Sequence, residues 1–160
     1  MTSLKDFSLE GKNAWVTGAT YGIGFNIAKA FHAAGIKNII FNDIDQEHVD
    51  RGLASYKEAG IENVHGYVCN VTDENAVEAL VKQIHEEVGQ IDILVNNAGI
   101  IKRIPMVEMS RKDFQQVIDI DLVGPFIVAK AVLPEMIERK EGKIINMCSM
   151  MSELGRETVS

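Results

Sequence analysis

The sequence has few cysteines, few prolines and no long apolar run, and each shortage excludes a class of protein. Cys69 and Cys148 are too few for a disulfide framework, and neither stands in a CxxC or histidine pattern that would bind zinc. The longest uncharged apolar stretch, residues 122–129, is too short to span a bilayer core of ~30 Å. Charges in the opening MTSLKDFSLEGK leave no apolar core for a signal peptide. We therefore expect a cytoplasmic protein with no metal ion and no membrane association.

Positive charge is also scarce. The chain carries 16 Lys and Arg against 23 Asp and Glu, a formal charge of −7, and its basic residues form no extended run. Such a surface repels a phosphate backbone, which excludes general nucleic-acid binding. A hydrophobic content of 46% is enough for a full core, and the length of 160 residues indicates one domain over residues 1–160.

Short β-rich segments alternate with segments of helical period along the chain. The first helix is expected to bury Ile23, Ile27 and Phe31, Thr72 is expected to cap a later helix, and one long helix is expected over residues 111–138. Parallel strands need helical crossovers of this length, so the pattern predicts a doubly wound α/β fold, a parallel sheet between two helical layers. The five strands are predicted at residues 13–16, 36–41, 64–68, 91–95 and 143–147.

A glycine-rich segment joins the first predicted strand to the first helix. Gly18, Gly22 and Gly24 are spaced as G-x-x-x-G-x-G around Thr20, Tyr21 and Ile23, and no Lys-Ser/Thr pair follows, which excludes a P-loop. Three glycines alone would indicate only a tight turn. Between a strand and a helix they favour a dinucleotide site, because glycine lets backbone N–H groups and the helix N-terminus approach a pyrophosphate.

Asp43 ends the second predicted strand, about 20 residues after the glycine loop, as expected of a ribose-binding acid. Its carboxylate can accept from both ribose hydroxyls and would repel a 2′-phosphate. Neither Thr20, Tyr21 nor Asn42 supplies a cation to offset that repulsion. We therefore predict NAD as the cofactor in preference to NADP.

With these motifs the sequence resembles the short-chain dehydrogenase/reductase family, whose members have the Rossmann fold. Residues 17–24 are similar to its TGxxxGxG loop and residues 96–99 to its NNAG motif. Asn70 and Val71 resemble its D-V pair beside the adenine, and the Asn70 amide oxygen is expected to accept from the adenine amino group. The resemblance covers all 160 residues and implies the following cofactor-binding residues: Gly18, Thr20, Tyr21, Gly22, Ile23, Gly24, Asp43, Asn70, Val71, Asn97, Ala98 and Gly99.

Ser149 follows the fifth predicted strand, at the sheet edge where doubly wound folds bind ligands. It matches the catalytic serine of the family, whose hydroxyl holds the substrate oxygen. The family's proton donor, the Tyr of a Y-x-x-x-K motif, has no counterpart in residues 1–160, and we expect it to lie beyond Ser160. The 160-residue chain, which looks like the N-terminal part of a member, is therefore expected to be inactive alone.

Asp121 is the second catalytic candidate and stands where the family has Asn. Helical spacing places it on the inward face with Phe114 and Val117. A buried carboxylate needs a partner, and two remain open: the water of the family's proton relay, or a cation in a later segment.

Residues 98–103 and 148–158 are most similar to gluconate 5-dehydrogenases within the family. That resemblance implies hydride transfer between NAD and a secondary alcohol of a sugar acid, D-gluconate or 5-keto-D-gluconate, by a homodimer or homotetramer. Arg103 and Arg156 would hold the substrate carboxylate, although each alone is equally typical of a solvated surface charge. The alternatives are a dehydrogenase for a related sugar acid or polyol, and a non-catalytic dinucleotide-binding fragment.

Overall fold

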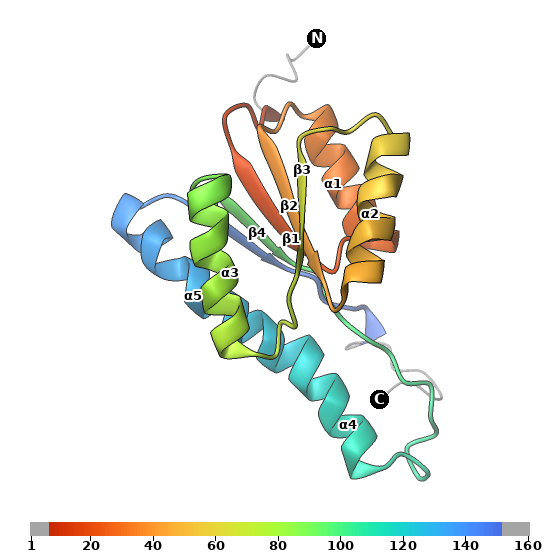
Figure 1. Cartoon of the computed structure of the whole chain (residues 1–160). Coiled ribbons are helices and arrows are strands. Elements are labelled where there is room, and N and C mark those ends of the chain that lie inside the picture. The colour runs from red at the N-terminus through yellow and green to blue at the C-terminus, as the bar shows by residue number, and fades with distance from the viewer. Residues whose placement is uncertain (1–6, 152–160) are drawn as a thin grey trace.

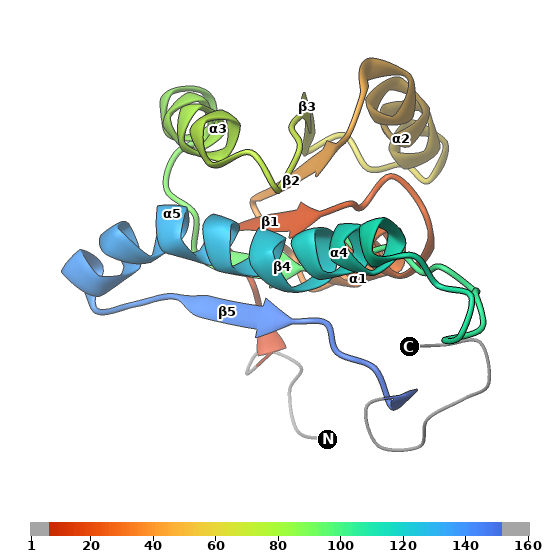
Figure 2. The same cartoon turned by 90° about the horizontal axis from the view of Figure 1, so that it is seen from below.

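The computed structural model describes residues 7–151, which form one sheet of five parallel strands with helices between them. The sheet order is β3-β2-β1-β4-β5, so β3 and β5 are its two edges (Figure 2). Every neighbouring pair is parallel, and the register runs from Asn13 opposite Asn38 to Asn96 opposite Asn146. The predicted doubly wound fold is confirmed. The strands are β1 Asn13–Thr17, β2 Asn38–Asp43, β3 Val64–Val68, β4 Ile93–Asn96 and β5 Lys143–Asn146.

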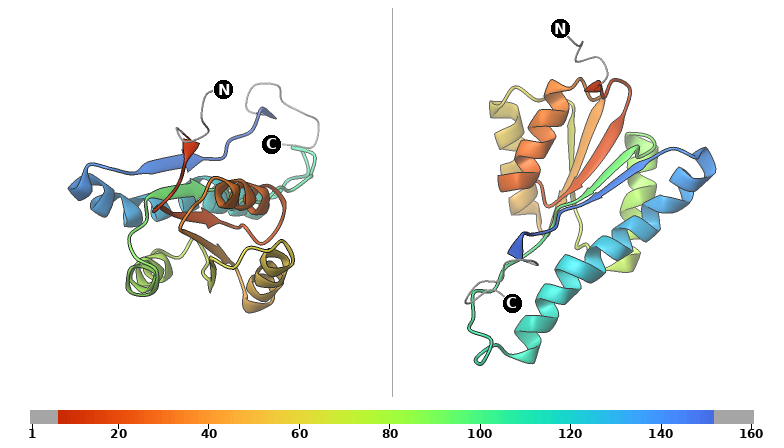
Figure 3. Two further views of the ribbon diagram at one scale, coloured as in Figure 1. Left: turned by 90° about the horizontal axis from the view of Figure 1, so that it is seen from above. Right: turned by 180° about the vertical axis from the view of Figure 1, so that it is seen from behind.

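Helices cover both faces of the sheet and make the predicted three layers. One layer holds α1 and α2, which lie side by side in the rear view of Figure 3, and the other holds α3 and α5. A helix α4 precedes α5 and extends past the carboxyl ends of the strands (Figure 1). Among residues 7–151, no helix combines the length and the apolar content needed to cross a bilayer. The bounds are α1 Gly22–Ala33, α2 Gln46–Glu58, α3 Glu74–Glu87, α4 Arg111–Ile118 and α5 Gly124–Arg139.

Alternating side chains of the central strands separate two apolar cores. Trp15 and Leu94 point toward α3 and α5, whereas Val16 and Val95 point toward α1 and α2. The strands β1 and β4 are buried on both faces, as parallel strands between helices are. The core therefore lies at the middle of the sheet and fixes the positions of the loops at its carboxyl edge.

Local predictions for α1, for α3 and for the long helix are wrong. Ile23 is 65% exposed, because Gly24 and Ala28 form the buried face of α1. Asp73, not Thr72, caps α3 by accepting from the Ala76 N–H.

The third concerns the long helix, which is interrupted between α4 and α5. Residues Asp119–Val123 form a π-helical turn, labelled η2, in which Gly124 N–H donates to the Asp119 carbonyl. Pro125 has no N–H, and its ring clashes with the carbonyl four residues earlier in a regular α-helix. The π-helical turn, which is wider than a regular α-helical turn, lies just before Pro125, where a continuous α-helix would contain that clash.

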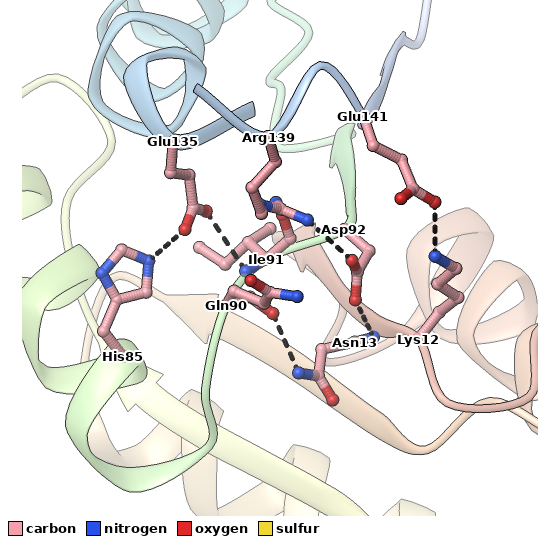
Figure 4. Close-up of polar contacts among 9 residues, drawn as sticks. All are labelled: Lys12, Asn13, His85, Gln90, Ile91, Asp92, Glu135, Arg139 and Glu141. Carbon is pink, nitrogen blue, oxygen red and sulfur yellow. Dashed lines mark hydrogen bonds and ion pairs between the residues drawn. The ribbon is translucent and has the colours of Figure 1, made fainter. Parts of the chain in front are cut away.

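A buried polar network ties α5 to the amino ends of β1 and β4 (Figure 4). The Asp92 carboxylate, 6% exposed, accepts from the Asn13 N–H at 2.9 Å and from Arg139 at 3.0 Å. Arg139 also donates to the Ile91 carbonyl at 2.8 Å. Glu135 accepts from the Ile91 N–H and pairs with His85 of α3. The network lies at the end of the sheet opposite the glycine-rich loop.

Candidate cofactor site

A cavity with a volume of about 690 Å³ lies at the carboxyl ends of the strands. It opens where the chain leaves β1 and β4 toward opposite faces of the sheet, the place where doubly wound folds bind ligands. Residues from five segments line it. They are Gly18, Tyr21, Gly22 and Ile23; Asn42, Asp43, Ile44 and His48; Cys69, Asn70, Val71 and Thr72; Asn97, Ala98, Gly99 and Ile100; and Gln116, Asp119 and Ile120.

The glycines of the loop are required by its geometry. Gly18 and Gly22 have φ of +61° and +66°, which side chains rarely adopt. A Cβ at Gly18 would stand 2.9 Å from the Ala98 Cα, and one at Gly24 would stand 2.5 Å from the Asn97 Nδ2. A Cβ at Gly22 would meet no atom within 4 Å, so its surroundings leave room for a ligand.

The N-terminus of α1, which follows this loop, is suited to an anion. Its N-cap residue Tyr21 makes no side-chain capping hydrogen bond, and its first turn has no acidic residue. By contrast, α2 and α3 are capped by Asp45 and Asp73. No capping carboxylate therefore occupies the first N–H groups of α1, and these groups and the helix dipole remain available for a pyrophosphate.

Asn97 and Thr17 join the glycine loop to the NNAG segment. The Asn97 amide donates to the carbonyls of Thr17 and Gly18 at 2.9 and 3.1 Å. The Thr17 hydroxyl, in a side chain only 2% exposed, accepts from the N–H groups of Asn97 and Ala98. These bonds hold the two loops at a fixed separation.

Asp43 and Asn70 lie on the next two strands outward. Asp43 is half-buried at the end of β2, and its Oδ1 accepts from the Ile44 N–H at 2.8 Å, which leaves further acceptor positions on the carboxylate. The Asn70 Oδ1 accepts from the N–H and the hydroxyl of Thr72. The oxygen expected to receive the adenine amino group is therefore engaged locally in this structure.

Cys69 also lines the cavity but is a poor nucleophile. Burial raises the pKa of its thiol to about 11. The side chain therefore stays neutral near pH 7 and contributes only apolar surface.

Asp121 contacts the backbone rather than the sheet core. Its Oδ1 accepts from the Ile100 N–H at 2.9 Å, and its carboxylate lies 3.5 Å from where a Cβ of Gly99 would be. Partial burial raises the pKa of the Asp121 carboxyl, and the hydrogen bond from Ile100 opposes that shift. The prediction that Asp121 shares an inward helical face with Phe114 is wrong, because no residue of α4 is buried and Phe114 is 43% exposed. Asp121 fixes the end of the NNAG segment.

Thr20, Ser149 and Arg103, among the described residues, do not line the cavity. Thr20 is 1% exposed, and its hydroxyl has no partner among the described residues. Ser149 is exposed after β5, where its hydroxyl accepts from the Met151 N–H at 3.1 Å. Arg103 is exposed in the loop between β4 and α4, and Arg156 lies outside the described residues. Among residues 7–151, most of the predicted cofactor residues line one cavity, whereas the predicted substrate residues Ser149 and Arg103 do not.

Thr17 and His48 are among the residues at this site that the sequence reasoning missed. Thr17 is the first residue of the glycine-rich motif, but its hydroxyl bonds to Asn97 and Ala98 depend on pairing across 80 positions. His48 stands five positions after Asp43, in the first turn of α2. The short separation between His48 and Asp43 was the sequence signal that could have identified His48 as a residue of this site.

Comparison with known proteins agrees with this geometry. The family model for short chain dehydrogenases matches residues 12–160. The chain belongs to the short chain dehydrogenase family. Members of this family bind NAD or NADP.

Three relatives of this short chain dehydrogenase are informative. It is 52% identical to the 2-dehydro-3-deoxy-D-gluconate 5-dehydrogenase of Formosa agariphila, covering 96% of this chain and 58% of that protein. The crystal structure of 2-keto-3-deoxy-D-gluconate dehydrogenase from Streptococcus agalactiae matches with a TM-score of 0.82 and 66% identity, over 98% of this chain and 59% of that one. The gluconate 5-dehydrogenase of Burkholderia cenocepacia, in complex with NADP and tartrate, matches with a TM-score of 0.88 and 38% identity, over 98% and 61%.

These relatives confirm the predicted likeness to gluconate 5-dehydrogenases. The chain spans 58% to 61% of the length of the three relatives. The NADP in the Burkholderia structure means that the comparisons do not support NAD over NADP.

Proposed function

We propose that the protein is an oxidoreductase that transfers a hydride between a nicotinamide dinucleotide and a secondary alcohol of a sugar acid. The observation that carries this proposal is the cavity at the carboxyl edge of the sheet, where two left-handed glycines, the uncapped α1 and the Asp43 carboxylate converge. The features would bind different parts of a dinucleotide. The glycine loop and the α1 N-terminus would bind the pyrophosphate, and Asp43 would bind the ribose.

For the cofactor, we propose NAD in preference to NADP at neutral pH. Asp43 lines the cavity at the end of β2. At ~4 Å and an effective dielectric of about 20, it would oppose each unit of charge on a 2′-phosphate by about 4 kcal/mol. The NADP in the Burkholderia relative makes NADP the alternative to test.

For the substrate, we propose a six-carbon sugar acid with its keto or alcohol group at C5. Relatives named for 2-dehydro-3-deoxy-D-gluconate and 2-keto-3-deoxy-D-gluconate are 52% and 66% identical, whereas the gluconate 5-dehydrogenase is 38% identical. The deoxy-keto acid is therefore our first candidate and D-gluconate the second. Arg103, in the loop after the NNAG segment, and Arg156 are proposed to hold the substrate carboxylate.

The chain's own residues would orient the reactants. Ser149 is proposed to donate a hydrogen bond to the substrate oxygen, which favours the charge that develops there during the transfer. Asn97 and Thr17 hold the loops around the cofactor, and Asp121 fixes the Ile100 end of the NNAG segment. The bound nicotinamide supplies the hydride chemistry itself.

We also propose that the complete protein is a homodimer or homotetramer in the cytoplasm. Exposed apolar side chains follow one another along α5, with Phe126 at 63%, Leu133 at 42% and Ile137 at 64% exposure. Several large exposed apolar side chains on one helix favour an interaction site over a solvated face.

Steady-state assays of the full-length protein test the proposed reaction. Oxidation of 2-keto-3-deoxy-D-gluconate, D-gluconate and galactitol with NAD or NADP is followed by absorbance of the reduced nicotinamide. Ser149→Ala should lower kcat by about 10²-fold or more, as removal of a single oxyanion donor does. Cys148→Ala, its exposed neighbour, is the matched control and should leave kcat unchanged.

The same assays separate an enzyme from a dinucleotide-binding module without turnover. The module remains the alternative because Ser149 does not line the cavity and residues 1–160 contain no Y-x-x-x-K motif. Tight NAD binding with no turnover of any sugar acid or polyol by the full-length protein would favour the module over the enzyme.

A further inference from the structure

A tyrosine of α2 is hydrogen-bonded to the glycine-rich loop. The Tyr56 hydroxyl donates to the Ala19 carbonyl at 2.8 Å, across 37 positions of the chain. Both residues are fully buried, at 0% exposure. Burial raises the pKa of Tyr56 above its usual range, so the hydroxyl keeps its proton and remains a donor. Ala19 lies between Gly18 and Tyr21, which both line the cavity. The bond is therefore made within the loop proposed to bind the pyrophosphate.

The helix α2 also packs closely against the two residues that follow Ala19. A Cβ at Gly52 would stand 3.3 Å from the Thr20 Cα and 2.8 Å from the ring of Phe41, which is too close for a real side chain. Glycine is otherwise unfavourable in a helix interior, so its presence here indicates that the sequence specifies this close approach. The Arg51 guanidinium, 5.7 Å from the centre of the Tyr21 ring, adds a second contact with the loop.

Glycine permits the shape of this loop but does not by itself select it. Gly18 has φ of +61°, and a glycine adopts positive and negative φ about equally readily. A peptide group is planar and trans, so the bond that holds the Ala19 carbonyl toward Tyr56 directs the Thr20 N–H of the same peptide group to the opposite side. The hydroxyl therefore restrains the loop beside a residue whose own backbone preference is weak.

We propose that Tyr56 is a positioning residue for the dinucleotide, because its hydroxyl holds the glycine loop in the conformation that binds the pyrophosphate. This inference rests on the proposed dinucleotide binding and adds a residue that does not itself line the cavity. A preorganised loop binds more tightly, since less conformational freedom is lost on binding. Removal of the hydroxyl leaves the buried Ala19 carbonyl without this donor and gives the loop access to other conformations. It should therefore weaken ligands that carry the diphosphate and spare those that lack it.

Tyr56→Phe in the full-length protein tests this role. The variant keeps the ring, whose centroid lies 4.7 Å from that of Phe25 and 5.3 Å from that of Phe41, so the core packing is retained. Tyr67→Phe is the matched control, since its hydroxyl donates to Glu87 at 2.8 Å and Tyr67 does not line the cavity. Isothermal titration calorimetry gives the dissociation constants of NAD, ADP and adenosine, of which adenosine alone lacks the diphosphate. Circular dichroism checks that both variants are folded at the titration temperature.

In Tyr56→Phe the dissociation constants of NAD and ADP should rise about tenfold, the effect of one hydrogen bond to a buried group, while that of adenosine stays unchanged. Tyr67→Phe should match the wild type for all three ligands. Unchanged NAD and ADP affinity in Tyr56→Phe would overturn the inference. An equal loss for ADP and adenosine would also overturn it, because Asp43, proposed to bind the adenosine ribose, leads into α2 and would report a general disturbance of that helix. Absence of NAD binding by the wild type would instead overturn the proposed function.

Discussion

The side-chain amide of Asn97 donates to the carbonyl of Thr17 at 2.9 Å, across 80 positions of the chain. This bond joins the end of β1 to the segment after β4, the two places from which the cavity opens. It therefore makes the shape of the candidate cofactor site depend on a contact between two loops rather than on either loop alone.

Replacement of Asn97 by Ala should weaken both folding and cofactor binding. It removes donors to Thr17 and Gly18 and leaves their carbonyls without these partners, which costs about 1–3 kcal/mol of stability. Asn38→Ala is the matched control, since its amide donates to Asn13 at the opposite end of the sheet. Urea unfolding should show a loss in both variants, and NAD titration should show weakened binding only in Asn97→Ala. Equal NAD affinity in the two would contradict the role given to Asn97.

Gly22→Ala should reduce NAD affinity more than it reduces stability. Gly22 and Gly60 have similar positive φ, +66° and +73°, and a Cβ at either meets nothing within 4 Å. Alanine at either position therefore incurs a similar backbone strain of about 1–2 kcal/mol. Gly60 lies after α2, outside the cavity. Calorimetric titration should show unchanged NAD affinity in Gly60→Ala and at least a tenfold loss (~1.4 kcal/mol) in Gly22→Ala.

Asp121→Asn should stabilise the protein at neutral pH, and the gain should shrink in acid. The pKa of the Asp121 carboxyl is raised in the folded state by partial burial. A raised carboxyl pKa favours folding where the group is protonated, and that contribution is lost as the pH rises through the folded pKa. The Asn amide oxygen still accepts from Ile100 without charge. Thermal unfolding of both proteins at about pH 7 and about pH 4 checks the trend.

Asp121→Leu separates the hydrogen bond from the charge. Leu offers no acceptor to the Ile100 N–H, so this variant should have a lower Tm than Asp121→Asn at both pH values. A Tm gain in Asp121→Asn that does not change with pH would contradict the electrostatic explanation.

Arg139→Met should destabilise the far end of the sheet without affecting the cofactor site. It leaves the Asp92 carboxylate, 6% exposed, without its cation, and breaking such a buried pair costs roughly 3–5 kcal/mol. Adding Asp92→Asn should recover part of the loss. Lys12→Met breaks a more exposed ion pair with Glu141 and should change the urea midpoint little. A change in NAD affinity in Arg139→Met would show that the two ends of the sheet are coupled.

The strands and most helices could be predicted from the sequence because their signals are local. The strand at residues 64–68 was predicted with the bounds that the structure has, since the alternation of side chains acts within a few residues. The π-helical turn was not predicted, because the apolar period continues through Asp119–Val123 while Pro125 changes the hydrogen bonding.

The candidate site was predicted where a motif itself carries the geometry. The glycine spacing located Gly18 and Gly22, and strand position located Asp43. The contacts of Thr17 depend on the backbone of Asn97 and Ala98, a distant segment that spacing along one motif does not encode. The Asn70 oxygen was assigned to the adenine, although the nearer Thr72 donors engage it.

A crystal structure of the full-length protein with bound NAD is the most direct test of the central claim, that the cavity at the carboxyl edge of the sheet is a dinucleotide site. The pyrophosphate oxygens should lie within hydrogen-bond distance of N–H groups in residues 18–24, and the adenosine ribose hydroxyls should bond to the Asp43 carboxylate. NAD bound elsewhere, or bound in this cavity without contact to the glycine loop, would contradict the claim.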